Sequence, residues 1–131
     1  MKNLTIIKSF HTKIWDEKDL SAIDEFFATD ALIHSPVRKT QGTSDMKKVI
    51  SLWHQAFPNL KVYWDDFICE GDKVVSRWHA KGQQEGDFLD YKVSKKEVNY
   101  SGVTIYQLDN GMITEYWTIV DMETLKEQLK G

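Results

Sequence analysis

The hydrophobic pattern of the chain changes its period near Pro58. Before this residue, apolar positions recur at three- and four-residue spacing, which predicts amphipathic helices. Three helices are expected there: residues 4 to about 17, residues 20–27 behind an Asp19 N-cap, and residues 43–57 between Gly42 and Pro58. A short strand at 31–34 precedes the third helix and ends before Pro36, which cannot donate a hydrogen bond to a ladder.

After Pro58, apolar and polar positions alternate, which is typical of strands with one buried face. Four long strands are expected, over residues 60–69, 73–84, 98–108 and 112–121, and a brief helix closes the chain at 122–129. Short turns of hairpin type join the first pair of strands and the last pair. Helices followed by such a meander are typical of an α+β domain, in which the helices cover one face of a curved, mostly antiparallel sheet.

The composition fits one globular domain that spans residues 1–131. The formal net charge is −3 and the charges of both signs are interspersed, which argues against binding to nucleic acid. No run approaches the roughly 20 apolar residues that span a bilayer, so we expect a soluble, cytoplasmic protein with no membrane partner. Cys69 is the single cysteine and cannot form an intramolecular disulfide, which is compatible with a reducing compartment.

The strand expected at 112–121 ends in a carboxylate. Its period of two places Trp117, Ile119 and Asp121 on one face. An acid at the end of such a face is expected to be partly desolvated, which raises its pKa and suits it to exchange protons near neutral pH. Asp121 can instead cap the helix that follows it, and the hydrogen bonds of a cap would lower the pKa.

The remaining polar residues indicate chemistry without a metal. The four histidines and the acids show no short ligand spacing of the kind that metal sites use, and the chain has no Gly-rich phosphate loop and no nucleophile elbow. We therefore expect no metal site. His34, at the end of the short strand, is expected either to hydrogen-bond a ligand from a pocket wall or to be a core histidine with protein partners.

A series of short motifs runs along the chain in the order of a known family. In sequence they are Asp30-Ala31-Leu32-Ile33-His34-Ser35-Pro36, Gly42, Phe57-Pro58-Asn59, Glu70-Gly71-Asp72-Lys73-Val74, Gly82, 86–88, Asn110-Gly111-Met112-Ile113, Trp117, Asp121 and Gln128-Leu129. Together they resemble the SnoaL-like polyketide cyclases, which belong to the wider nuclear-transport-factor-two-like and ketosteroid-isomerase-like fold group. The resemblance covers nearly the whole chain.

The resemblance implies a cone-shaped fold, in which helices lie against a strongly bent sheet and enclose a mostly apolar pocket. It also implies that the carboxylate after the family tryptophan, here Asp121, is the general acid/base of an aldol ring closure that uses no cofactor. A base removes a proton next to a carbonyl, the enolate attacks a second carbonyl of the same molecule, and the new alkoxide is protonated. His34 is the second catalytic candidate.

Two positions depart from the family pattern. The family commonly has Gly-Thr-His-Thr-Gly where this chain has Gly82-Gln83-Gln84-Glu85-Gly86, so Gln84 replaces the histidine that would assist the acid. Glutamine forms hydrogen bonds but cannot exchange a proton near neutral pH. The Thr-Gly-Lys turn of the family is Ser94-Lys95-Lys96 here, which predicts a different loop at the pocket mouth and hence a different ligand.

We therefore expect a cofactor-free acid/base enzyme, an aldol-type cyclase, isomerase or lyase, that acts on a small apolar carbonyl-bearing substrate. The alternative is a non-catalytic module of the same fold that binds a small molecule. A ketosteroid-isomerase reaction is a third option, because an Asp base works there with a tyrosine. The residues expected to contact the substrate are Trp53, Phe57, Trp78, Gln84, Trp117 and Ile119.

The expected assembly is a homodimer. In the strand at 112–121, Tyr116, Thr118 and Val120 alternate with the residues assigned to the pocket and are expected on the outer face of the sheet. An uncovered face of this kind is better buried against a partner, and members of the family commonly dimerise. His79 is expected to point away from the pocket, in a structural or interfacial role.

Overall fold

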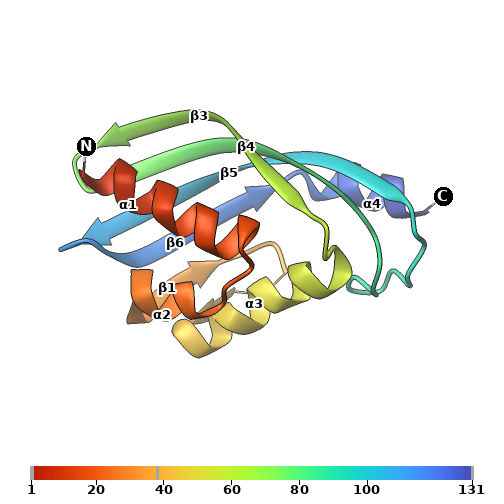
Figure 1. The fold of residues 1–131 in the computed structure, drawn as a ribbon, viewed down its shortest axis with the longest axis horizontal. Helices are drawn as coiled ribbons and strands as arrows, with labels where there is room; N and C mark the ends of the chain where they lie inside the picture. The colour runs from red at the N-terminus through yellow and green to blue at the C-terminus, as the bar shows by residue number, and fades with distance from the viewer. Residues whose placement is uncertain (1, 38, 131) are drawn as a thin grey trace.

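A curved six-stranded sheet with helices against one face makes up the computed structural model, which describes residues 2–37 and 39–130 (Figure 1). The helical elements are α1 (Lys2–His11), the π-helical turn η1 (Thr12–Asp16), α2 (Ser21–Phe26), α3 (Thr43–Ala56) and α4 (Met122–Lys130). The strands are β1 (Phe27–His34), β2 (Lys39–Gln41), β3 (Lys61–Glu70), β4 (Lys73–Gln83), β5 (Glu97–Asp109) and β6 (Met112–Val120). The α+β class expected from the sequence is confirmed.

The strand order is β2-β1-β6-β5-β4-β3. Neighbouring strands run antiparallel except β1 and β6, which are parallel and pair Ile33 with Tyr116. The expected curved, mostly antiparallel sheet is therefore confirmed, and the sheet is open rather than closed. Figure 1 shows α1, α2 and α3 on one side of the sheet, whereas α4 lies at the end of the molecule away from α1. None of the helices in the described residues is long and apolar enough to cross a membrane.

Three local features near the amino terminus differ from what the sequence predicted. The backbone of Phe27 is already extended, so β1 begins four residues earlier than expected, and Phe27, Ala31 and Ile33 are the residues it buries. The second helix therefore ends at Phe26. The short edge strand β2 was not expected, and the first helix widens into a π-helical turn after His11 instead of continuing unchanged to 16–18.

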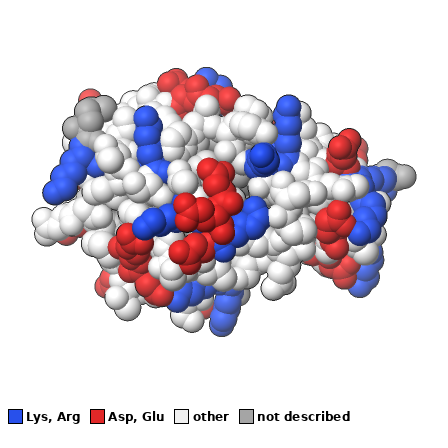
Figure 2. Space-filling view, in the orientation of Figure 1, with Lys and Arg blue, Asp and Glu red and all other residues white. Residues whose placement is uncertain are grey.

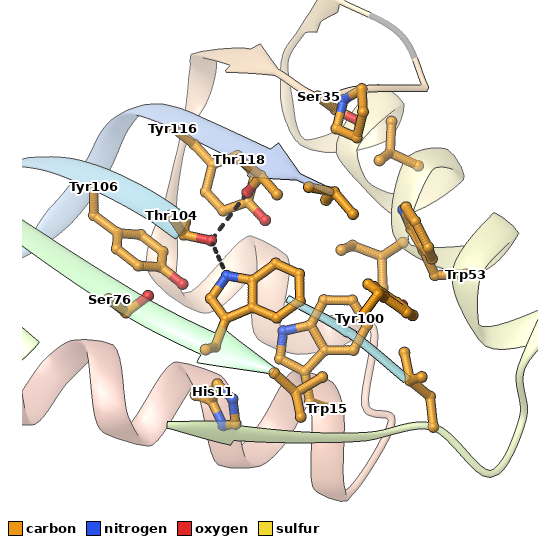
Figure 3. A pocket seen from close by; sticks show the side chains of 17 residues that line it. His11, Trp15, Ser35, Trp53, Ser76, Tyr100, Thr104, Tyr106, Tyr116 and Thr118 are labelled. Atoms are coloured by element: carbon orange, nitrogen blue, oxygen red, sulfur yellow. Dashed lines mark hydrogen bonds between the residues drawn. The ribbon is translucent and has the colours of Figure 1, made fainter. Parts of the chain in front are cut away.

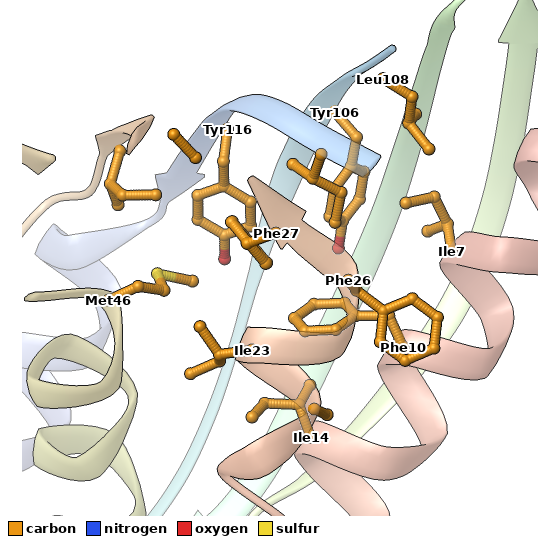
Figure 4. Packing of buried hydrophobic residues seen from close by; sticks show 14 of the residues in the cluster. Ile7, Phe10, Ile14, Ile23, Phe26, Phe27, Met46, Tyr106, Leu108 and Tyr116 are labelled. Carbon is orange, nitrogen blue, oxygen red and sulfur yellow. The ribbon is translucent and has the colours of Figure 1, made fainter. Parts of the chain in front are cut away.

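Two apolar clusters fill the space between the helices and the sheet. The first contains Phe10, which makes edge contacts with Phe26 and Phe27 at ring-centroid distances of 5.7 and 5.3 Å (Figure 4). The second contains Trp53 of α3, which packs on Phe88 at 4.8 Å. Between the two clusters, some of the inward residues of β4, β5 and β6 are polar. The candidate site lies against these residues.

Charges of both signs lie close together on the face that carries the helices (Figure 2). Acidic side chains gather near its centre with basic ones beside them. Lys13 Nζ lies 2.9 Å from Glu25 Oε1, and Lys47 Nζ lies 2.5 Å from Asp24 Oδ2. Such exposed pairs contribute about 0–1 kcal/mol each, so apolar packing rather than charge holds these helices together.

Candidate active site

A largely apolar pocket lies between the two clusters (Figure 3). The amino-terminal helix and η1 contribute His11 and Trp15, and α3 contributes Ile50 and Trp53. The inner face of the sheet forms most of the rest of the wall, and residues next to the ends of β1 and β3 add Ser35, Pro36 and Leu60. The cavity volume is about 40 Å³, which is room for about three water molecules. A ligand with rings therefore has to displace side chains of the wall.

The register of the sheet places a row of hydroxyl groups on this wall. Ser76 of β4 pairs with Thr104 of β5, which pairs with Thr118 of β6. All three side chains line the pocket. The next inward row pairs Tyr106 with Tyr116, whose phenols also line it. Five hydroxyl groups from three adjacent strands thus face the same space.

These hydroxyls are linked to one another. The Trp78 indole N–H donates to Thr104 Oγ1 at 2.9 Å, and the Thr104 and Thr118 hydroxyl oxygens lie 3.2 Å apart (Figure 3). Side-chain hydrogen bonds also connect Tyr106 with Ser76 and Tyr116 with Thr118. Mutually bonded hydroxyls are held in fixed positions, so the wall offers a preorganised set of donors and acceptors.

The tyrosines of the pocket remain protonated over the physiological range. Burial raises the pKa of Tyr116 to about 12, and it raises the pKa of Tyr106 well above its usual range, with the neighbouring Tyr116 adding to the effect. Burial also raises the pKa of Tyr100. A neutral phenol can donate a hydrogen bond, and the same burial strengthens a bond to a negatively charged oxygen.

Gly102 makes room for the indole of the wall. It pairs with Trp78 across β4 and β5, and a Cβ atom at this position would lie 2.4 Å from the indole ring and 2.5 Å from the Ile119 carbonyl oxygen. Any side chain at 102 therefore collides with Trp78 or with the backbone. The absence of a side chain lets the indole lie over the sheet and reach Thr104.

Among the described residues, His11 is the one imidazole on the pocket wall. It is buried, and its ring makes an edge contact with Trp64 at a centroid distance of 4.3 Å. Burial lowers the pKa of His11 to about 4, so the ring is neutral at pH 7. Its Nε2 atom has no hydrogen-bond partner among the described residues. An unsatisfied buried polar atom costs about 1–3 kcal/mol, which a bound molecule would relieve.

An open groove lies on the other side of the same wall, between η1 and β3. His11, Trp15, Leu60 and Val62 line both the groove and the pocket. Lys18 closes the groove at one end, where its ammonium donates to the carbonyl oxygens of Trp15 and Leu60 at 3.1 and 3.4 Å. The imidazole of His11 therefore stands between the enclosed pocket and an open surface.

Two of the expected contact residues line the pocket and two lie elsewhere in the core. Trp53 and Trp78 are on the wall. Phe57 is fully buried and packs on Phe88 instead, at 5.4 Å. Gln84 is fully buried and holds the loop between β4 and β5, because its amide donates to the Tyr91 carbonyl and its oxygen accepts from the Ser94 hydroxyl.

The expected faces of β6 were reversed. Tyr116, Thr118 and Val120 line the pocket rather than the outer surface, whereas Ile119 is 63% exposed on the opposite face. Trp117 lies on that face too, beside His34 of β1, and the two rings stack at 5.4 Å. Alternation predicts two faces but not which is inside, and both faces of this strand carry large apolar residues.

Asp121 lies outside the pocket, at the start of α4. Its carboxylate accepts the Thr124 backbone N–H at 3.1 Å and the Thr124 hydroxyl at 2.7 Å. These bonds lower the pKa of Asp121, the hydroxyl bond having the larger effect, so the expected raised pKa is wrong. The alternative, a helix cap, is what the structure contains. The catalytic role of Asp121 stays a prediction that its position does not favour.

His34 and His79 both pair with carboxylates at the sheet surface. His34 Nε2 lies 2.8 Å from Glu115 Oε2, and His79 Nδ1 lies 2.8 Å from Asp65 Oδ1. His34 does not line the pocket, whereas its neighbour Ser35 does. Of the two alternatives for His34, the structure contains the one with protein partners, at the sheet surface rather than in the core, because the parallel pairing with β6 places it against Trp117.

Sequence reasoning missed the pocket residues His11, Ser76, Thr104, Tyr106, Tyr116 and Thr118 as a set. One signal was present for His11, because a polar residue interrupts the apolar stripe of the first helix. The hydroxyl rows gave no such signal, since they depend on the register of three strands. Among the described residues, no group of three or more His, Cys, Asp and Glu side chains is placed to hold a metal ion.

Comparison with known proteins identifies the family. The model of the SnoaL-like polyketide cyclase family matches residues 5–129, and the chain therefore belongs to this family. Among curated proteins, none matches the chain significantly.

Solved structures show the same fold at low sequence identity. A protein of Jannaschia sp. CCS1 described as a SnoaL-like polyketide cyclase is 22% identical, with a TM-score of 0.91 over 99% of this chain and 92% of that one. IdmH of Streptomyces antibioticus, described as a polyketide cyclase, is 22% identical, with a TM-score of 0.83 over 100% of both chains. AclR of Streptomyces galilaeus, described as a hydroxylase, is 22% identical, with a TM-score of 0.86 over 98% of this chain and 80% of that one.

Proposed function

We propose that the protein is a cofactor-free enzyme of the cyclase type, which binds a small apolar molecule with two carbonyl groups and closes a ring within it by acid/base chemistry. Membership of the SnoaL-like polyketide cyclase family supports a cyclase-type function. The observation that carries the proposal is the hydroxyl-rich wall in an otherwise apolar pocket. Such a wall orients a carbonyl group while the aromatic residues hold the apolar body of the substrate.

Tyr106 and Tyr116 are the proposed donors to the reacting carbonyl. Their phenols remain protonated at all physiological pH values because burial raises the pKa of both. When a proton leaves the carbon next to the carbonyl, negative charge develops on the carbonyl oxygen. A donor fixed before the reaction stabilises this enolate, and removal of one such donor typically lowers the rate by about 10²–10³.

A non-catalytic binding module is the second candidate. It is favoured by one observation: among the described residues, none of those that line the pocket carries a carboxylate. The carboxylate that the family uses as acid/base corresponds to Asp121, which caps α4. A binding module would keep the apolar pocket and the hydroxyls but would not move a proton.

An enolisable ketone distinguishes the two candidates without knowledge of the natural substrate. We would measure by NMR the rate at which 2-tetralone exchanges its α-protons in D2O, and the binding of 2-naphthol, a flat mimic of the enolate. An enzyme accelerates the exchange above the buffer rate. A binding module binds 2-naphthol and leaves the exchange rate at that of buffer.

Phenylalanine variants of the two donors test the role of the wall. Tyr106→Phe and Tyr116→Phe remove a hydroxyl and keep the ring, so we expect exchange to fall by about 10²–10³ for the variant that loses the main donor. Tyr63→Phe is the matched control, because Tyr63 is exposed and stacks on His79 outside the pocket. If neither pocket variant differs from this control, the hydroxyl wall has no part in the reaction.

A further inference from the structure

Among the described residues that line the pocket, His11 carries the one imidazole, which is a neutral base at pH 7, and its Nε2 has no described hydrogen-bond partner. His11 Nε2 is buried and unpaired, on the wall that η1 and α1 form across from the sheet. Buried polar atoms in proteins are almost always paired, so each exception calls for an explanation. A substrate atom in the pocket provides one.

We propose that His11 is the catalytic base of this pocket, which takes the α-proton of the substrate on Nε2 and returns it to the alkoxide formed at ring closure. This proposal rests on the proposed function of the same site and names the residue that performs it. The edge contact with Trp64 packs the ring against β3, and the buried Nε2 becomes accessible when a substrate with rings displaces side chains of the wall.

The reaction needs no oxidant, reductant or other reagent besides His11 and the substrate. The proton moves from the carbon to Nε2, and the electron pair of that C–H bond becomes the C=C bond of an enolate. The enolate carbon forms a C–C bond with the second carbonyl, whose oxygen becomes an alkoxide. The imidazolium of His11 then protonates this alkoxide, so the product is an isomer of the substrate.

The surroundings of His11 suit both the removal of the α-proton and its return to the alkoxide. In the free protein the low pKa of His11 keeps the ring neutral, so it is able to accept a proton. A neighbouring enolate would raise the pKa of His11 in the complex. The other charged or titratable groups on this side are Lys8 over the Trp64 ring, Asp16 on the groove, and Lys18 and His54 beyond Trp15. The three phenols of the pocket face it from the sheet.

The groove between η1 and β3 gives the proton a route to solvent. His11 lines this groove as well as the pocket, so a small movement of the imidazolium toward the groove would expose its buried Nε2–H to water. The exchange of 2-tetralone in D2O requires this second step, because deuterium reaches the carbon only after the base has traded its proton with the solvent.

The test compares His11→Gln with His54→Gln. Glutamine keeps hydrogen bonding at position 11 but cannot exchange a proton near neutral pH, so we expect 2-tetralone exchange to fall by about 10²–10⁴ with 2-naphthol binding retained. His54 is the matched control, because its Nε2 is also buried without a described partner and its pKa is also lowered by burial, but it does not line the pocket. His54→Gln should exchange 2-tetralone as fast as the wild type.

Two further measurements separate catalysis from a structural role. The exchange rate of the wild type should rise with pH through the pKa of His11, and this limb should be absent in His11→Gln. In ¹⁵N-labelled protein, the Nε2 resonance of His11 should shift when 2-naphthol binds, since the phenol would then be its hydrogen-bond partner.

Each contrary outcome points to a different failure. Undiminished exchange by His11→Gln would overturn the role of His11 and leave the proposed function standing. Equal losses in His11→Gln and His54→Gln would also overturn it, because the effect would then be that of removing any buried imidazole from these helices. If the wild type binds 2-naphthol without accelerating exchange, the proposed function fails together with its base, and the binding module is what remains.

Discussion

The two faces of the sheet differ in how they combine polar and apolar groups. The inner face mixes aromatic rings with hydroxyls that bond to one another, as in the row of Ser76, Thr104 and Thr118. The outer face places Ile119 and Ile68 more than half in solvent, with histidine–carboxylate pairs at its sides. The inner face can bury its hydroxyl groups because they bond to one another and enclose a pocket, whereas the apolar residues of the outer face lie among charged ones.

The outer face is where we expect a single change to have the largest effect on assembly. The outward residues Ile68, Val75, Ile105 and Trp117 follow one another across four strands, and such a face is better buried against a second copy of the chain. Ile119→Glu should therefore weaken a dimer by about 10² or more, since a charge is introduced into an apolar contact. Light scattering at micromolar concentration measures the mass.

The control for this prediction lies off the sheet. Val93 is 46% exposed in the loop between β4 and β5, so Val93→Glu adds the same charge to an apolar surface position and should leave the dimer intact. A wild-type protein that has the mass of a monomer at micromolar concentration contradicts the expectation of a dimer. In that case the outer face would be a soluble surface despite its isoleucines.

The inner face is expected to be the less tolerant of added volume. Gly102→Ala places a Cβ against the Trp78 indole and the Ile119 carbonyl, and overpacking of this kind costs about 1–3 kcal/mol. The neighbouring residue of the same strand, Ser101, is exposed on the outer face, so Ser101→Ala should change the free energy of unfolding by less than about 0.5 kcal/mol. Urea denaturation measures both, and equal values would mean that Trp78 moves aside freely.

The sequence predicted the period of each strand better than its orientation. In β6, Tyr116 and Val120 on one face and Trp117 and Ile119 on the other are equally compatible with a core, and the choice is made by the parallel pairing with β1, which no local pattern encodes. His11 was visible as a polar residue on an apolar helix stripe. Gln84 was singled out, but as a contact residue of the pocket, because its four hydrogen bonds to the loop depend on how residues 85–96 fold back.

Asp121 offers the smallest expected effect on stability and the sharpest test of the comparison with the family. Asp121→Ala removes the acceptor for Thr124 and should lower the melting temperature by a few degrees, whereas Asp121→Asn keeps an N-cap acceptor and should lower it less. Because the pKa of Asp121 is lowered in the folded state, its contribution is present above its unfolded pKa of about 3.9 and is lost as the pH falls through the folded value. The difference between wild type and Asp121→Ala should therefore disappear in acid.

Asp121→Asn and His11→Gln together decide which of the two residues carries the chemistry. Asp121 lies outside the pocket, so Asp121→Asn should exchange 2-tetralone as fast as the wild type while His11→Gln does not. A loss of about 10²–10⁴ in Asp121→Asn with unchanged stability would instead have the size of a lost acid/base group. The carboxylate would then have to leave Thr124 and turn toward the pocket when substrate binds, because in the free protein its two hydrogen bonds hold it at the start of α4.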